Sequence, residues 1–324
     1  MRALIARLSL CGAALLSASM PAIAQAPLPK LIKIVVPFSA GASNDVVARA
    51  IAVPLAERLQ ATVIVENKPG AAGVIGADAV AKAPRDGSVL LLTSSTFVTA
   101  AATQAHLPYD PLAAFTPVVM VGEGPLLLAV SAAAPFKSPD ELFAAARAKP
   151  EKLTYGTAGV GSVGHLATVL LNDAAKSRMT HVPYKGAANA AQDLAGGQID
   201  VMVSNYSTLA PLMQKDGGRV RALAVTSKQA HPSFVGLPAL AATVPGFAMD
   251  IWIGVFAPAG TPAAVVERLN REITEISASP ALSAVLGPDG TLPNAMNASA
   301  FAARVKEELA TWKQLAATHR IVAE

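Results

Sequence analysis

The sequence alternates short apolar runs, turns rich in small residues, and helical segments. The first such unit has an apolar run at 32–36, a small-residue turn at 37–44 and a helical segment at 45–59, in which Pro54 predicts a kink. The same unit recurs several times along the chain. Apolar runs of this kind are typical of buried parallel strands. The alternation therefore predicts an α/β fold with mostly parallel sheets that are flanked by helices.

The pattern restarts near residue 125 and so divides the chain. The middle segment carries its own strands, turns and helices, and Ser138-Pro139 followed by Glu141 is typical of a helix start. A chain of about 300 residues is long enough for two domains. We therefore predict two α/β lobes joined by two hinge crossings. Lobe 1 comprises residues 27–124 and 229–324, and lobe 2 comprises residues 125–228.

Residues 1–24 have the layout of a cleavable signal peptide. Arg2 and Arg7 give a positive start, an apolar run follows at 8–18, and Ala22-Ile23-Ala24 is a small-x-small cleavage pattern. The run is too short to cross roughly 30 Å of hydrocarbon as a helix. Cleavage after Ala24 would deliver the protein to the periplasm without Cys11, the only cysteine. Cys11 also allows a lipoprotein, which the bulky residue before it disfavours.

The charge and the titratable residues exclude several classes of protein. The formal net charge is +4, and the signal peptide supplies half of it. So small an excess does not indicate a nucleic-acid surface, and we expect no nucleic-acid partner. The five histidines are scattered, and none pairs with another at metal-ligand spacing. No metal site is therefore predicted.

Three turns share one design, because each follows a strand, is rich in small residues and leads into a helix. They lie at 37–43, 156–162 and 184–187. Such junctions expose unpaired N–H groups at the positive end of a helix dipole and bind anions without a cationic side chain. In open α/β sheets they lie at the carboxyl ends of the strands, where ligands bind. One turn from each lobe would hold the two ends of a short dicarboxylate.

The candidate ligand-binding residues come from these turns and from neighbouring strand ends. Lobe 1 contributes Phe38, Ser39, Ala40, Gly41, Ser43, Ser94 and Ser95. Lobe 2 contributes Thr157, Ala158, Gly159, Gly161, Ser162, His165, Tyr184, Gly186 and Asn205. His165 contacts the ligand or supports its own turn, and turn support is favoured. Asp45 is expected to cap or balance its helix rather than to contact a ligand. Lys185 pairs with a carboxylate or is solvated.

Two motif-based alternatives fail on neighbouring residues. The segment 159–164 fits the dinucleotide fingerprint, but the next strand ends at Tyr184 without an acidic residue for a ribose hydroxyl. Ser162 lacks the glycine two positions earlier that a hydrolase nucleophile elbow needs, because that residue is Val160. We therefore predict neither a dinucleotide site nor an enzyme.

Several segments of the chain resemble the solute-binding proteins of tripartite tricarboxylate transporters, often called the Bug family. They include Glu66-Asn67-Lys68-Pro69-Gly70 and His181-Val182-Pro183-Tyr184-Lys185-Gly186, together with residues 34–38, 45–49, 107–111, 115–118, 152–156, 193–200, 221–227 and 256–262. The resemblance covers essentially the whole mature chain. The order and spacing of the segments make it specific.

The resemblance implies a type II-like periplasmic binding protein of the Venus flytrap kind. It implies a monomer that binds a small mono- or dicarboxylate between its lobes and delivers it to membrane permease subunits, without a cofactor or a metal. In such proteins, backbone amides and ordered waters hold the carboxylate. The loop at 38–44 and Ser204-Asn205-Tyr206 depart from the family pattern and affect the identity of the ligand. A sensory protein that presents its ligand to a receptor and a secreted hydrolase are the alternatives.

Overall fold

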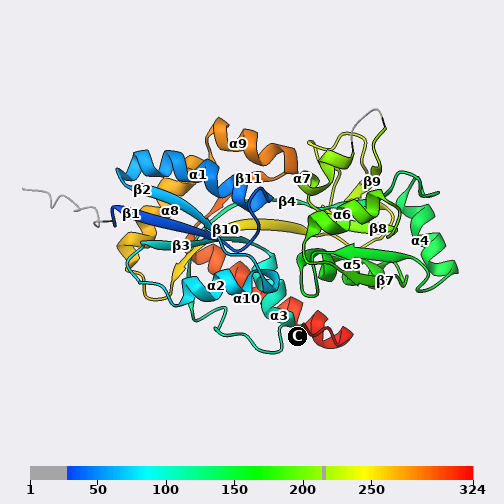
Figure 1. Ribbon diagram of the computed structural model, residues 1–324, viewed down its shortest axis with the longest axis horizontal. Coiled ribbons are helices and arrows are strands. Elements are labelled where there is room, and N and C mark those ends of the chain that lie inside the picture. The colour runs from blue at the N-terminus through cyan, green and yellow to red at the C-terminus, as the bar shows by residue number, and fades with distance from the viewer. Residues whose placement is uncertain (1–27, 214–216, 324) are drawn as a thin grey trace, which may run out of the picture.

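The computed structural model describes residues 28–213 and 217–323. In this part of the chain, two sheets with their covering helices form two lobes side by side (Figure 1). The predicted signal peptide, residues 1–24, and its cleavage after Ala24 lie outside the described residues. Within the described ranges, no helix is long and apolar enough to cross a membrane.

Lobe 1 is built on a six-stranded sheet with the order β11-β4-β10-β3-β1-β2. Its strands are β1 Leu31–Val36, β2 Thr62–Asn67, β3 Val89–Ser94, β4 Phe115–Pro125, β10 Asp250–Pro258 and β11 Leu292–Met296. Its helices are α1 Ser43–Leu59, α2 Val74–Ala81, α3 Thr96–Thr103, α8 Ala263–Ser277, α9 Pro280–Leu286 and α10 Ala298–His319, with the 3-10 turns η1 Ala71–Gly73 and η4 Gly287–Asp289. Pro54 lies inside α1, as predicted.

Lobe 2 is built on a five-stranded sheet with the order β7-β6-β8-β5-β9. Its strands are β5 Leu127–Ser131, β6 Thr154–Thr157, β7 Thr180–Pro183, β8 Val201–Ser204 and β9 Val220–Val225. Its helices are α4 Pro139–Ala148, α5 Val163–Ala174, α6 Ala187–Ala195 and α7 Tyr206–Leu209, followed by the 3-10 turn η2 Ala210–Leu212. Ser138 caps α4 by accepting from Glu141 N at 3.2 Å, which confirms the predicted helix start.

The sheets are mixed, whereas the sequence predicted mostly parallel ones. β1 pairs in parallel with β2 and β3, and β6 pairs in parallel with β7 and β8. The strands next to the hinge instead run antiparallel to their neighbours, namely β4 and β10 in lobe 1 and β5 and β9 in lobe 2. The chain leaves lobe 1 along β4 and returns along β10, so these two strands run in opposite directions.

The two hinge crossings are joined by one threonine. β4 ends in the lobe 1 sheet at Pro125, and β10 re-enters that sheet at Asp250. Between them, the buried Thr226 accepts from Leu126 N through Oγ1 at 2.7 Å and from Met249 N through its carbonyl at 2.8 Å. The crossings are therefore held against each other.

The segment that follows β9 packs against lobe 2 before the chain returns. Val225 N donates to Pro238 O at 2.9 Å, and Ala239 forms a parallel bridge with Val225. Phe234 lies in the same buried apolar cluster as Leu127 of β5. From the sequence, we placed the lobe boundaries after residues 124 and 228. We now propose boundaries at 125/126 and 249/250, where the strands change sheets.

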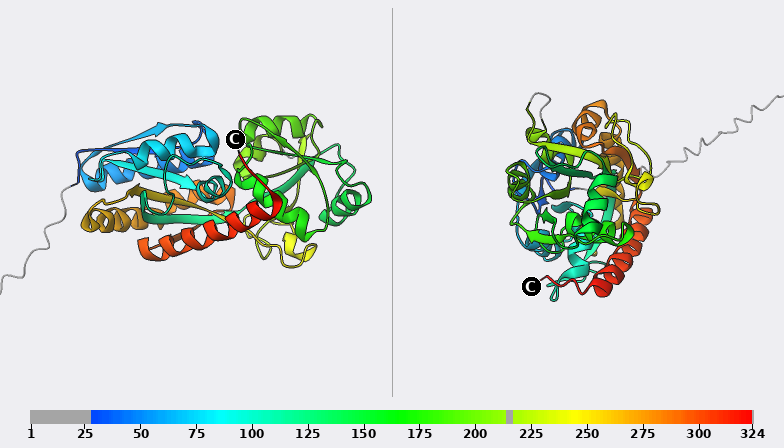
Figure 2. Two further views of the ribbon diagram at one scale, coloured as in Figure 1. Left: turned by 90° about the horizontal axis from the view of Figure 1, so that it is seen from below. Right: turned by 90° about the vertical axis from the view of Figure 1, so that its right-hand side faces the viewer.

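The longest helix follows lobe 1 as far as lobe 2. In Figure 2, α10 runs along one side of lobe 1 and ends beside lobe 2. At that end, His319 Nε2 lies 2.5 Å from Asp173 Oδ2 of α5. One buried apolar cluster also extends through the hinge, with Trp252 of β10 at its lobe 1 side and Leu128 of β5 in lobe 2.

Candidate functional site

The first candidate turn, residues 37–43, is organised by the buried carboxylate of Asp45. Asp45 Oδ2 accepts from Gly41 N at 2.9 Å and from Arg49 Nε at 3.0 Å, and Oδ1 accepts from Asn67 Nδ2 at 2.9 Å. The same Asn67 amide donates to Phe38 O at 3.1 Å. Burial raises the pKa of Asp45, but the hydrogen bonds from Arg49, Gly41 and Asn67 outweigh it and hold the pKa below its usual value. Asp45 thus acts as a turn anchor.

Several N–H groups at this turn and the start of α1 remain available. Those of Ser39, Ala40, Ser43 and Asn44 have no hydrogen-bond acceptor within the described part of the chain. They lie at or just before the first turn of α1, where the helix dipole is positive. The turn and its loop are also exposed or half-buried, so an external anion can reach them.

Replacing Asp45 by alanine should loosen this turn. The Gly41 N–H, the Asn67 amide and Arg49 would lose an acceptor, and we expect the free energy of unfolding to fall by about 2 kcal/mol. Ligand affinity should fall as well, because the N–H groups of Ser39 and Ala40 would no longer be held. Urea denaturation and calorimetry measure the two effects.

The matched control is Asp86→Ala, which removes a turn carboxylate that accepts from Ser88 N at 2.9 Å on the exposed surface. It should leave ligand affinity unchanged. Equal losses of affinity in the Asp45 and Asp86 variants would show that Asp45 has no special part in binding.

The second candidate turn, residues 156–162, uses part of its own hydrogen-bonding capacity. Ser162 Oγ donates to Gly159 O at 2.7 Å, and Gly159 N donates to Thr157 Oγ1 at 3.2 Å. Gly161 N donates to His165 Nδ1 at 3.3 Å, so His165 supports the turn. Ser162 and His165 therefore bond to the backbone, not to each other as a nucleophile and its base would.

His165 belongs to a stack of rings beneath the turn, in which His165 and Tyr155 are buried and His181 is half-buried. Its ring lies 3.9 Å from that of His181, centroid to centroid, and the planes are 11° from parallel. Tyr155 also stacks on His181, at 5.0 Å between ring centroids, and His181 Nε2 lies 2.7 Å from Thr157 Oγ1. Burial lowers the pKa of His165 to about 4 and, with the neighbouring imidazole, that of His181 to about 4. Both rings are thus neutral near pH 7.

The second turn also keeps free N–H groups. Those of Ala158, Val160, Val163 and Gly164 have no acceptor among residues 28–213 and 217–323. Val163 and Gly164 are the first two residues of α5, at its positive end. Each lobe thus presents a set of unpaired amides at a helix start.

The helix start of lobe 2 lies where the lobes meet. Gly161 has a positive φ of 80°, and a methyl group on it would lie 2.2 Å from Thr103 Oγ1 of α3. The lobe 2 turn therefore packs directly on lobe 1. The close fit also explains the need for glycine, since a side chain would require both strained backbone and displaced neighbours.

The other predicted site residues have different surroundings. Ser95 is buried, and its Oγ accepts from Trp252 N at 3.0 Å, so it joins β3 to β10. Ser94 precedes it and is also buried. Tyr184 Oη donates to Asp193 Oδ2 at 2.7 Å. Gly186 and Asn205 are the residues just before α6 and α7, and both are half-buried.

Asp289 lies at the candidate site, although the sequence analysis did not select it. It is 6 % exposed and ends the 3-10 turn η4. Its Oδ2 accepts from Ser43 Oγ at 2.6 Å, and its Oδ1 accepts from Ser207 N at 2.6 Å. Ser43 was predicted to donate to a ligand, but here its hydroxyl donates to the protein's own carboxylate. The sequence around Asp289, Gly-Pro-Asp-Gly, indicates only a turn.

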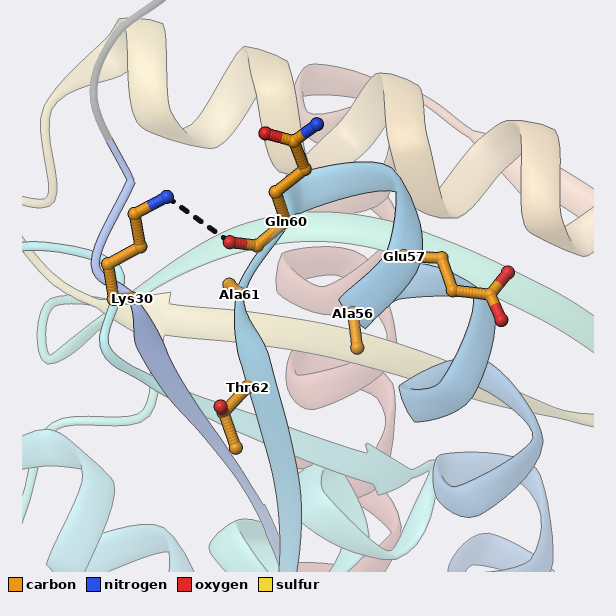
Figure 3. A pocket seen from close by; sticks show the side chains of 6 residues that line it. All are labelled: Lys30, Ala56, Glu57, Gln60, Ala61 and Thr62. Atoms are coloured by element: carbon orange, nitrogen blue, oxygen red, sulfur yellow. Dashed lines mark hydrogen bonds between the residues drawn. The ribbon is translucent and has the colours of Figure 1, made fainter.

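Two pockets are lined without residues of the candidate turns, although the predicted site residue Ser95 lines the second. Figure 3 shows a hollow of about 510 Å³ at the other end of α1, lined by Lys30, Ala56, Glu57, Gln60, Ala61 and Thr62. It borders the amino ends of β1 and β2, opposite the helix starts described above. A second pocket of about 650 Å³ lies between α10 and the start of β10. Within the described residues, no cluster of His, Cys, Asp or Glu could hold a metal ion.

Comparison with known proteins gives a consistent result. The family model described as tripartite tricarboxylate transporter family receptor matches residues 47–320. An R. palustris protein solved with adipate is 34 % identical, with a TM-score of 0.82 and coverage of 90 % of this chain and 98 % of the other. The periplasmic binding protein BugD is 33 % identical, with a TM-score of 0.81 and the same coverage.

A further structure, MatC from Rhodopseudomonas palustris with bound malate, is 31 % identical, with a TM-score of 0.78 and coverage of 88 % and 98 %. These proteins share the two-lobed fold, and the family model spans both lobes. The chain therefore belongs to the tripartite tricarboxylate transporter receptor family, the periplasmic solute-binding proteins that include BugD.

Proposed function

We propose that this protein captures a small mono- or dicarboxylate between its lobes in the periplasm and delivers it to the membrane subunits of a transporter. In this proposal it is exported, is cleaved after Ala24, acts as a monomer and catalyses no reaction. The ligand carboxylate bonds to the unpaired N–H groups of the two helix starts, directly or through water. Closure of the lobes then excludes bulk water and strengthens each N–H···O⁻ bond.

One observation carries this proposal. The N–H groups of Ser39 and Ala40 in lobe 1 and of Ala158 and Val160 in lobe 2 have no acceptor in the described chain. The lobe 2 turn packs on lobe 1 at Gly161, and Asp289 connects Ser43 of the lobe 1 turn to Ser207 of lobe 2. Unpaired amides at helix starts bind anions. No arginine or lysine side chain is needed for such a site, and small residues keep the backbone open to the ligand.

The structural relatives support the same class of ligand. One of them was solved with adipate and another with malate, and both ligands are small carboxylates. The unpaired amide donors of the turns suit a ligand with one or two carboxylates. We expect micromolar or tighter binding, which corresponds to about −8 kcal/mol.

Thermal denaturation of the mature protein with a panel of carboxylates tests the proposal. A true ligand at a concentration 100 times its Kd stabilises the folded state by about 2.7 kcal/mol, which raises the Tm by roughly 5 °C. Adipate, malate and shorter monocarboxylates form the panel, and the corresponding neutral amides are the controls. The amides should leave the Tm unchanged, because they carry no negative charge for the helix starts. A panel in which no carboxylate raises the Tm contradicts the proposal.

A further inference from the structure

Asp289 bonds to both lobes. The carboxylate belongs to η4 of lobe 1, where it accepts from Ser43 Oγ at the start of α1. From lobe 2 it accepts two hydrogen bonds, from Ser207 N at 2.6 Å and from Ser207 Oγ at 3.0 Å. Ser207 is the second residue of α7, directly behind Asn205 and Tyr206. One carboxylate thus connects helix starts of the two lobes.

Ser43 and Ser207 are the main hydrogen-bond partners of the Asp289 carboxylate. It is 6 % exposed, and it forms no ion pair with any described residue. A buried carboxylate without a cation depends on its hydrogen bonds, because water no longer solvates it. Separation of the lobes would remove two of the three bonds and expose the charge to water. The carboxylate therefore accepts from Ser43 and Ser207 in this arrangement, whereas water would replace Ser207 when the lobes part.

The backbone around Asp289 is fixed on both sides. Gly290 has a positive φ of 66°, and a methyl group there would lie 2.6 Å from Phe234 Cε2, in the segment that packs on lobe 2. A methyl group on Gly124 of β4 would lie 2.6 Å from Gly290 O. The loop is therefore held between the crossing strand β4 and lobe 2. Its position changes little unless the hinge itself moves.

We propose that Asp289 is a positioning residue that latches the two lobes together and thereby sets the distance between the helix starts. With the latch in place, the amides of lobe 1 and lobe 2 stay close enough to bind the same carboxylate. All of the bonds of this latch are formed by groups of the protein itself, so it favours this arrangement of the lobes before binding and slows opening after it. This inference rests on the proposed function only where ligand release is concerned.

The first test needs no ligand. We compare the mature wild-type protein with Asp289→Asn, which removes the charge and replaces one of the two accepting oxygens by an NH₂ donor. Small-angle scattering should give a larger radius of gyration for Asp289→Asn, because the lobes separate. Ser207→Ala, which removes one interlobe bond from the lobe 2 side, should shift the radius in the same direction by less. An unchanged radius in both variants overturns the latch.

The matched control is Asp110→Asn. Asp110 is also a turn carboxylate of lobe 1, and it accepts from Leu112 N at 2.8 Å, but it has no hydrogen-bond partner in lobe 2 within the described chain. The radius of gyration of the Asp110→Asn variant should equal that of the wild type. If Asp289→Asn does not fold, Ser207→Ala and Ser43→Ala provide the comparison, and only Ser207→Ala should open the lobes.

The second test uses adipate and malate as probes. We expect the dissociation rate to rise about tenfold in Asp289→Asn, as for the loss of a hydrogen bond to a charged group. Asp289→Glu, which keeps the carboxylate, should restore part of the slow release. If neither probe binds the wild-type protein but the scattering differs as expected, the latch stands and the choice of ligand class is wrong. If the probes bind and all dissociation rates agree, the latch is refuted.

Discussion

A bulky residue at Gly161 should abolish ligand binding while the protein stays folded. A methyl group at this position would lie 2.2 Å from Thr103 Oγ1, and Thr103 Oγ1 is itself held by Thr99 O at 3.0 Å. Overpacking of this kind costs about 1–3 kcal/mol. Because the contact joins the lobes, separating them relieves the clash, so the cost falls on the closed arrangement. We expect Gly161→Ala to weaken carboxylate binding roughly 10- to 100-fold, and Gly161→Leu to prevent it.

Two further variants separate the clash from backbone strain. Gly197 also has a positive φ, of 69°, but a methyl group there would meet nothing within 4 Å. Gly197→Ala should therefore cost about 1–2 kcal/mol of stability through φ alone and leave binding unchanged. Thr103→Ala removes the oxygen that clashes, so the double variant with Gly161→Ala should regain much of the affinity. Equal binding by Gly161→Ala and the wild type would refute the interlobe contact. Calorimetry measures each affinity.

The protein should lose stability in acid because of the stacked histidines. Burial lowers the pKa of His165 to about 4 in the folded protein, whereas the unfolded chain keeps a pKa near ~6.5. The unfolded chain therefore binds the proton first as the pH falls, and protonation favours unfolding. Above about pH 6.5, His165 contributes about 3 kcal/mol to the free energy of unfolding. This contribution is lost as the pH falls to ~4. His181 acts in the same direction.

The pH dependence can be assigned to the stack by substitution. Glutamine at position 165 still offers an oxygen to the Gly161 N–H but does not titrate over this range. Urea denaturation of His165→Gln between pH 7 and pH 4 should give a flatter curve than the wild type. His106→Gln serves as the control because His106 is exposed, and its curve should follow that of the wild type. Parallel curves for His165→Gln and the wild type would show that the stack is not the cause.

The first strand, turn and helix of lobe 1 could be predicted well from the sequence. The run 32–36 became β1, which begins one residue earlier, and the segment 45–59 became α1, which begins at Ser43. Apolar runs and small-residue turns are local features, so the sequence shows them directly. The same holds for the start of α4, which Ser138-Pro139 and Glu141 indicate and which the structure places at Pro139.

The helix α3, Thr96–Thr103, could not be predicted in the same way. Its sequence, Thr-Phe-Val-Thr-Ala-Ala-Ala-Thr, has no charged residue and no exposed face, and seven of its eight residues are buried. A helix buried on every side lacks the period of 3.6 residues that identifies an amphipathic helix. Its role as the surface that meets Gly161 depends on the arrangement of the two lobes, which no local pattern encodes.

The contacts of Asp289 could not be predicted from the sequence either. Its partners Ser43 and Ser207 lie 246 and 82 residues away in the chain. The hydrogen bonds form only when the hinge places η4 between α1 and α7, and the Pro-Asp-Gly motif by itself predicts no more than a turn. The antiparallel pairing of β4 with β10 was missed for a similar reason, since an apolar run does not reveal the direction of its neighbour.

The strand order of lobe 1 dictates when this protein can finish folding. β10 lies between β4 and β3, so it fills the middle of a sheet whose other strands, except β11, precede it by more than a hundred residues. Until residues 250–258 have emerged, β3 and β4 each expose an apolar strand edge that other chains can pair with. Lobe 2 has no such delay, because its five strands form one continuous stretch of chain. The late arrival of β10 keeps the nascent chain incompletely folded, the condition under which a polypeptide can be threaded across a membrane.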